Sequence, residues 1–232
     1  MKNIIFIHGA WHGGWCWKKI EPYFSDDEYN VLFFDIHSSK NPHDDMSFEG
    51  SINLLKEKIE KMTGDVILVA HSMGGMYATQ VSEYFVNKIS KIIYVSGFIP
   101  KDNQSCLDLA LNDVGIVKFG LIFNDAKTLV TVDEKIIRPA FYNDVSEDDY
   151  AFCRENIKPQ NFSHYTTKVK LASDNSKKTT RIFIRCMRDM AITPGFQTIM
   201  ALENGCDIYD LDSGHSPFLS KVNEFVDLIK KF

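Results

Sequence analysis

The 232-residue sequence has few cysteines, no long apolar run and no excess of basic residues. Its five cysteines stand singly, without a C-x-x-C pair that would indicate a zinc or redox site, and such spacing is typical of reduced thiols in a cytosolic protein. No stretch approaches the roughly 18 apolar residues of a membrane span, and the apolar run near the N-terminus is too short for a secretory signal. A formal net charge of −5 provides no basic field for nucleic acid or an anionic membrane. We therefore expect a cytoplasmic protein.

Short strand-like runs alternate with helical patterns along most of the chain. The strand-like runs, rich in branched and aromatic residues, cover residues 3–8, 30–35, 65–71, 91–97, 181–187 and 207–211. The helical patterns cover residues 48–62, 74–87, 195–204 and 219–231. Most strand-like runs are apolar on both faces, as in a parallel sheet covered by helices. This order predicts an α/β fold with an open, mostly parallel sheet.

The alternation stops between about residues 101 and 180. This segment has helical pieces, no clear strand and polar stretches such as "NDVSEDDY". Structureless loops of that length are uncommon in compact domains. We expect a helical cap over residues 101–180, inserted into a core formed by residues 1–100 and 181–232.

A serine stands between a buried strand and a helix in the string "VILVAHSMGGMYATQ". Ser72 is flanked at two residues' distance by Ala70 and Gly74, and Gly75 follows where the helix must pack closely. This is the G-x-S-x-G pattern of a strained nucleophile turn, with alanine in its first place. The alternative is that Ser72 only caps the helix, so partners decide between the two interpretations.

The partners follow from chain order, which in this type of site runs serine, acid, histidine. His215 comes after the last strand, in "DLDSGHSPFLS", and Asp189 ends the preceding strand in "RIFIRCMRDM". Both positions lie at the carboxyl edge of the sheet, where open α/β sheets place their sites. Asp102, Asp210 and Asp212 are the alternative acids.

The other histidines fit this order less well. His8 and His71 end strands next to turns, and we expect them to shape those turns by packing or hydrogen bonding. The remaining histidines fall in the wrong part of the chain: His12, His37, His43 and His164.

A glycine-containing loop, "HGAWHGGWCW", directly follows the first strand. Its glycines let backbone N–H groups turn toward a pocket. We expect the N–H groups of Ala10 and Met73 to form an oxyanion hole, which stabilises charge that develops only in the transition state. The string matches neither common phosphate-loop pattern.

These motifs together resemble the α/β-hydrolase superfamily, in particular the branch of plant methylesterases, hydroxynitrile lyases and their bacterial esterase-like relatives. The matching strings are "FIHGAWHGGWCW", "VAHSMGG", "SGFIPKDNQS", "RCMRDMAITPGFQ" and "GHSPFLSK". The resemblance implies Ser72 as nucleophile, His215 as base and Asp189 as orienting acid. It also implies that residues 101–180 cover the pocket.

Two positions favour ester hydrolysis over cyanohydrin cleavage. Lyases of one stereochemical class in this branch carry threonine at the position of Gly9 and lysine at that of Ser216. We therefore expect a serine hydrolase that cleaves small to medium carboxylic esters through an acyl-enzyme, without metal or cofactor. The alternatives are lyase-like C–C cleavage and a ligand-binding receptor on a hydrolase scaffold.

The expected partner is a small-molecule ester rather than nucleic acid or a membrane, and a homodimer is left open. Aromatic residues of the 101–180 segment could line an apolar pocket, although most should form the segment's own core. The candidates are Phe119, Phe123, Phe141 and Tyr142.

Overall fold

A six-stranded parallel sheet forms the centre of the computed structural model, which describes residues 1–25, 27–36, 47–171 and 175–232. The strand order is β2-β1-β3-β4-β8-β9, and every neighbouring pair is parallel. The strands are β1 (Lys2–Ile7), β2 (Tyr29–Phe34), β3 (Val66–His71), β4 (Ile89–Val95), β8 (Thr180–Cys186) and β9 (Asp207–Leu211). The predicted strands and the α/β class are confirmed.

Helices follow the strands as the apolar spacing predicts. They are α1 (Phe48–Lys61), α2 (Gly74–Ser82), α7 (Pro194–Glu203), α8 (Pro217–Ser220) and α9 (Val222–Lys231). The helix predicted over 74–87 ends earlier, because β4 starts at Ile89 and the chain must turn before it. The last predicted helix is divided at Lys221, whose φ of −132° and ψ of 48° are not helical. None of the helices in the described ranges is long and apolar enough to cross a membrane.

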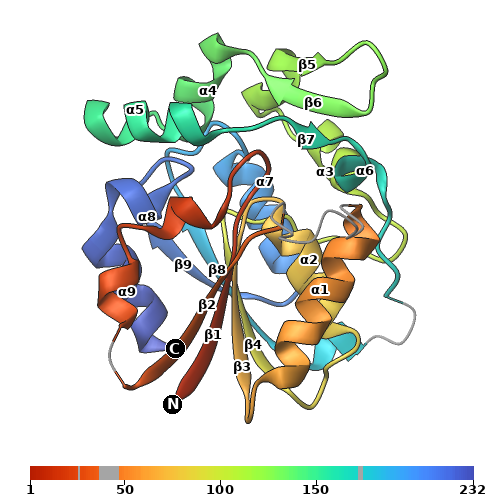
Figure 1. The fold of residues 1–232 in the computed structure, drawn as a ribbon, viewed down its shortest axis with the longest axis vertical. Helices are drawn as coiled ribbons and strands as arrows, with labels where there is room; N and C mark the ends of the chain where they lie inside the picture. Colours follow the sequence, from red (N-terminus) through yellow and green to blue (C-terminus); the bar gives the residue numbers. More distant parts are fainter. Residues whose placement is uncertain (26, 37–46, 172–174) are drawn as a thin grey trace.

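Helices cover the sheet on both sides (Figure 1). α1 and α2 pack together on one side, and α8 and α9 pack with the 3₁₀ helix η1 (Gly14–Trp17) on the other. Aromatic rings fill this second layer: Trp17 lies 4.5 Å from Phe218 and 5.2 Å from Phe6 of β1, measured between ring centroids. Burial of these large rings stabilises the packing of η1 and α8 against the sheet.

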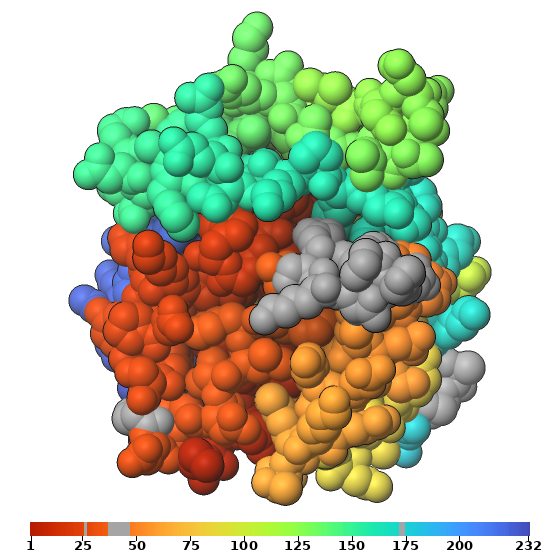
Figure 2. Space-filling model, viewed as in Figure 1, coloured from red at the N-terminus to blue at the C-terminus, as the bar shows by residue number. Residues whose placement is uncertain are grey.

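Residues 106–166 lie across the carboxyl ends of the strands, at the top of Figure 1, and Figure 2 shows them as a continuous layer above the N-terminal residues. The end of the 101–180 segment instead runs down beside the sheet, where residues 175–178 pack against α2. Its helices are α3 (Cys106–Asn112), η3 (Ile116–Gly120), α4 (Glu134–Phe141), α5 (Glu147–Asn156), α6 (Ser163–Thr166) and η4 (Asn175–Lys178).

The expectation of a purely helical segment is wrong. Residues 101–180 also contain a three-stranded antiparallel sheet in the order β5-β6-β7. Its strands are β5 (Leu121–Phe123), β6 (Leu129–Val132) and β7 (Gln160–Asn161). Strands of two to four residues are too short for the alternation of polar and apolar residues that identifies a strand in a sequence.

Candidate active site

Ser72 lies at the turn between β3 and α2, as predicted, with a backbone φ of +54°. Residues other than glycine rarely adopt this left-handed conformation, and it is a mark of functional turns. The neighbouring glycines are required by close packing. A Cβ at Gly74 would lie 2.5 Å from the Ile7 oxygen, and one at Gly75 would lie 2.1 Å from the Phe98 oxygen. The predicted need for small residues around the serine is confirmed.

Asp189 and His215 meet at the carboxyl edge of the sheet. Asp189 follows β8, and His215 lies between β9 and α8. His215 Nδ1 is 2.7 Å from Asp189 Oδ2, and both side chains are buried. The other carboxylate oxygen, Oδ1, accepts hydrogen bonds from the N–H groups of Ala191 at 2.7 Å and Ile192 at 3.1 Å. The loop after β8 therefore fixes the carboxylate with one oxygen facing the imidazole.

Two further side chains donate to the Asp189 carboxylate, and neither was identified from the sequence. Ser96 Oγ donates to Oδ2 and lies 3.2 Å from His215 Nδ1. Gln197 Nε2 donates to the same oxygen at 2.9 Å, and its own oxygen accepts the Cys186 N–H at 2.9 Å. Ser96 directly follows β4, a strand end where functional residues gather, so its place in the chain was a usable signal. Gln197 sits inside α7, and its position carries no such signal.

The alternative acids do not reach His215. Asp102 accepts a hydrogen bond from the Leu171 N–H at 2.7 Å and lines a different cavity. Asp210 and Asp212 each pair with an arginine, at 2.7 Å and 2.9 Å. Of the four candidate carboxylates, only Asp189 contacts the histidine.

The glycine-rich loop (residues 8–14) lies beside the turn that holds Ser72, and Ala10 belongs to this loop. A Cβ at Gly9 would lie 2.7 Å from Ser72 Cβ, so the loop and the serine are in direct contact. Within the described ranges, neither the Ala10 N–H nor the Met73 N–H donates a hydrogen bond to another group. Both residues line the cavity that contains Ser72. Two free backbone donors beside a serine are what an oxyanion hole needs.

Two further buried histidines lie close to this site and hydrogen-bond its backbone. His71 Nε2 donates to the backbone oxygen of His215 at 2.9 Å, and the two ring centroids are 4.5 Å apart. His12 Nδ1 donates to the Ala10 oxygen at 2.6 Å, and its Nε2 accepts from the Tyr142 hydroxyl at 2.6 Å. Burial lowers the pKa of His12 to about 3 and holds the pKa of His71 well below 6.5. Both rings are therefore neutral at pH 7.

The remaining histidines also have structural contacts. His8 Nε2 accepts the Ile36 N–H at 2.9 Å, which confirms its predicted part in a turn. His164 Nδ1 bonds the Tyr77 hydroxyl. His37 and His43 lie outside the described residues.

The low pKa of His12 predicts a loss of stability in acid. The unfolded chain takes up a proton below about pH 6.5, while folded His12 resists protonation down to about pH 3. The unfolded state thus binds more protons, and His12 alone should lower the free energy of unfolding by about 1.4 kcal/mol for each pH unit below 6.5, in addition to the contribution of His71. Urea denaturation at several pH values between about 4.5 and 6.5 measures this slope. His12→Gln should reduce this slope by about 1.4 kcal/mol per pH unit, because glutamine does not titrate. An unchanged slope in this variant would contradict a low pKa of His12.

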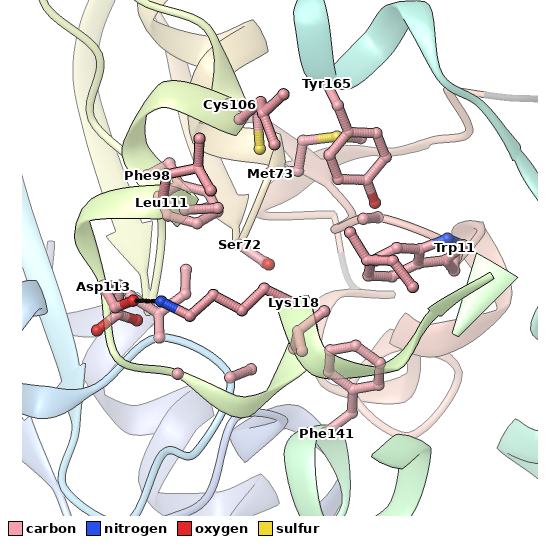
Figure 3. A pocket seen from close by; sticks show the side chains of 18 residues that line it. Trp11, Ser72, Met73, Phe98, Cys106, Leu111, Asp113, Lys118, Phe141 and Tyr165 are labelled. Carbon is pink, nitrogen blue, oxygen red and sulfur yellow. Dashed lines mark hydrogen bonds between the residues drawn. The ribbon is translucent and has the colours of Figure 1, made fainter. Parts of the chain in front are cut away.

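An apolar cavity of about 170 Å³ opens beside Ser72 (Figure 3). The Ser72 hydroxyl points into it, with Trp11 and Tyr165 on one side and Phe141 on another. Among the aromatic residues expected to line a pocket, Phe141 does so. Phe119 and Phe123 are instead exposed, and Tyr142 is buried against His12.

In the part of the chain that the structure describes, no hydrogen bond joins Ser72 Oγ to His215. The structure therefore brings the acid and the base into contact, and places the serine at the cavity with its hydroxyl turned into the open space. Catalytic hydrogen bonds are often long before substrate binds.

Comparison with known proteins identifies the family of this chain. The model of the alpha/beta hydrolase family matches residues 4–228. The chain belongs to this family. It is 26% identical to Methylesterase 9 of Arabidopsis thaliana, over 100% of this chain and 98% of that protein. It is also 26% identical to putative methylesterase 13, chloroplastic, of the same plant, over 95% of this chain but only 53% of that protein.

Solved structures show the same fold. A methylesterase from Arabidopsis superposes with a TM-score of 0.85 at 21% identity, covering 100% of this chain and 98% of that one. A pyrethroid hydrolase from Sphingobium faniae superposes with a TM-score of 0.81 at 18% identity, covering 100% and 96%.

Proposed function

We propose that this protein is a serine-dependent carboxylic ester hydrolase that acts on small to medium esters through an acyl-enzyme. The observation that carries the proposal is the buried contact of 2.7 Å between His215 and Asp189, next to the turn that holds Ser72. A binding protein would not need this pair, because binding alone requires neither a base nor an acid to orient it. The matching family and the methylesterase relatives support the same activity.

The proposed mechanism follows from the contacts of each group. Asp189 accepts the Nδ1–H of His215, so Nε2 carries a lone pair and can take the Ser72 proton. Ser72 Oγ attacks the ester carbonyl carbon, and the negative oxygen that forms is held by the N–H groups of Ala10 and Met73. His215 gives its proton to the leaving alcohol. Water then loses a proton to His215 and attacks the acyl carbon. As the bond between this carbon and Ser72 Oγ breaks, His215 returns that proton to Oγ, which releases the acid and restores the serine hydroxyl.

The 101–180 segment is proposed to be a cap that completes the substrate cavity. Residues from α3, η3 and α4 line the cavity opposite Ser72, including Leu107, Lys118 and Phe141. Most of the lining is apolar, which favours esters with an apolar acyl group. Since several relatives are named methylesterases, methyl esters are the first substrates to test. The cytoplasmic location stays a prediction from sequence.

Hydrolysis is favoured over cyanohydrin cleavage by the surroundings of Gly9 and Ser216. A side chain at Gly9 would collide with Ser72, since a Cβ there lies 2.7 Å from Ser72 Cβ. The loop thus has no room for a hydroxyl that could hold a substrate oxygen. Ser216 is fully buried at the start of α8 and provides no positive charge for a departing cyanide.

A substrate panel tests the proposal. We expect turnover of methyl and p-nitrophenyl esters of graded acyl length, and cyanide release from mandelonitrile no faster than in buffer. Product formation is followed by absorbance and by a cyanide assay on the same preparation. Rapid cyanide release without ester turnover would replace the proposal with a lyase. A single turnover that leaves the ligand bound would indicate a receptor.

A further inference from the structure

Among the described residues, the hydrogen bonds of Trp11, which follows Ala10 in the glycine-rich loop, all come from the 101–180 segment. The Trp11 N–H donates to Gln160 Oε1 at 2.9 Å, and its indole Nε1 donates to the Val130 oxygen at 3.0 Å. Its own carbonyl oxygen accepts the Lys158 N–H at 3.2 Å. β6 and β7 therefore form hydrogen bonds with the loop that contains Ala10, a proposed oxyanion donor.

Trp11 needs such contacts because its backbone is strained. Its φ is +61°, in the left-handed region that a bulky residue occupies only when its surroundings enforce it. The peptide group between Ala10 and Trp11 is held at both ends: His12 Nδ1 bonds the Ala10 oxygen at 2.6 Å, and Gln160 bonds the Trp11 N–H. This peptide group and the Gly9–Ala10 peptide, which carries the Ala10 N–H, share the Ala10 Cα, so fixing the first restricts the orientations open to the second.

One side chain contacts both Trp11, the neighbour of Ala10, and the side chain of Met73. Gln160 is 1% exposed, and while its oxygen accepts the Trp11 N–H, its Nε2 lies 3.6 Å from Met73 Sδ. Met73 supplies the other proposed donor, which is its backbone N–H. Gln160 pairs with Val130 in the β6-β7 ladder, so its backbone position is fixed by the sheet of the 101–180 segment.

We propose that Gln160 is a positioning residue that couples the 101–180 segment to the oxyanion hole. It keeps Trp11 in its left-handed conformation and thereby aims the Ala10 N–H at the oxygen that becomes negative in the transition state. The proposal rests on the ester hydrolase function above. Gln160 acts through the loop and does not touch the reacting atoms.

The test is Gln160→Met, which has similar length and cannot accept the Trp11 N–H. Loss of one oxyanion donor typically lowers kcat on the order of 10²- to 10³-fold, and we expect about 10²-fold here, with KM changed less than about threefold. Affinity for a trifluoromethyl ketone, which forms a tetrahedral adduct with serine, should fall in parallel. Affinity for the matching methyl ketone should not. The acid limb of the pH profile should stay in place, because His215 and Asp189 are untouched.

Gln80 offers a matched control. It is also buried, on α2, and its amide bonds both the N–H of Lys170 at 2.7 Å and the oxygen of Lys170 at 3.0 Å. Gln80→Met thus removes a similar buried contact with the backbone of the 101–180 segment, away from the glycine-rich loop. Both variants should lower the melting temperature, and only Gln160→Met should lower kcat. An equal loss of kcat in both, or an unchanged kcat in Gln160→Met, would overturn the proposal.

A second readout separates this proposal from the hydrolase function. The phosphoryl oxygen of a fluorophosphonate occupies the oxyanion hole while Ser72 reacts, so Gln160→Met should slow the phosphonylation of Ser72 by a similar factor. This holds even if no ester of the panel is turned over. Gln160→Asn, whose shorter amide cannot span the same distance, replaces Gln160→Met if that variant fails to fold. Wild-type protein that neither hydrolyses esters nor reacts with fluorophosphonate would contradict both the function and the proposal.

Discussion

Ser72→Ala should lower kcat for ester hydrolysis on the order of 10⁶-fold, to the rate that the remaining groups provide. The expected loss is large because the alanine side chain cannot form the acyl-enzyme, while His215, Asp189 and the two N–H groups stay in place. The change removes one oxygen from a side chain that is 8% exposed at the cavity and forms no hydrogen bond in the described structure. The melting temperature should therefore hardly change. Initial rates with p-nitrophenyl acetate measure the effect.

Ser82→Ala is the matched control for this variant. Ser82 is fully buried on α2, where its hydroxyl donates to the Thr79 oxygen at 2.8 Å, and it does not line the cavity. It should keep wild-type kcat. A fluorophosphonate should label wild-type protein and Ser82→Ala on the peptide with Ser72, and should leave Ser72→Ala unlabelled. Labelling of another serine, or full activity of Ser72→Ala, would disprove the nucleophile assignment.

Sequence patterns predicted the parts of the fold that depend on contacts close in the chain. The run Val66–His71 is apolar on both faces and becomes the central strand β3, and the small residues after it form the turn. Chain order also placed Asp189 and His215 at one edge of the sheet, because parallel strands end on the same side. Their distance of 2.7 Å needed the structure, since it depends on the loops after β8 and β9.

The side chains that support the Asp189 carboxylate and the glycine-rich loop were not predicted. Gln160 meets Trp11 across a sequence separation of 149 residues, and β7, which positions it, has two residues. Ser96, which follows β4, and Gln197 of α7 both donate to the Asp189 carboxylate, and neither residue type is specific to such a position. In the proposed mechanism these residues support Asp189 and the glycine-rich loop, whereas the motif residues carry out the reaction. Supporting contacts can be made by many side chains, so they leave a weaker pattern in one sequence.

Asp189→Asn should lower kcat by about 10⁴-fold while the fold is kept. The structure gives the reason. Asp189 Oδ1 accepts two backbone N–H groups, so the amide oxygen of asparagine would take that place and its NH₂ would face His215. An NH₂ group donates, and His215 would then hold its proton on Nε2, where it cannot accept one from Ser72. The same NH₂ would also face the donors Ser96 and Gln197.

Asp102→Asn tests whether the acid has been assigned correctly. Asp102 bonds only the Leu171 N–H among the described groups, so its amide oxygen can make the same contact and kcat should stay near the wild-type value. The kcat values of both variants should be compared at equal folded fraction, determined by circular dichroism. If Asp102→Asn lost activity and Asp189→Asn did not, the acid would be Asp102. If Asp189→Asn instead raised KM at constant kcat, Asp189 would bind substrate and not orient His215, because an orienting acid acts on the transition state.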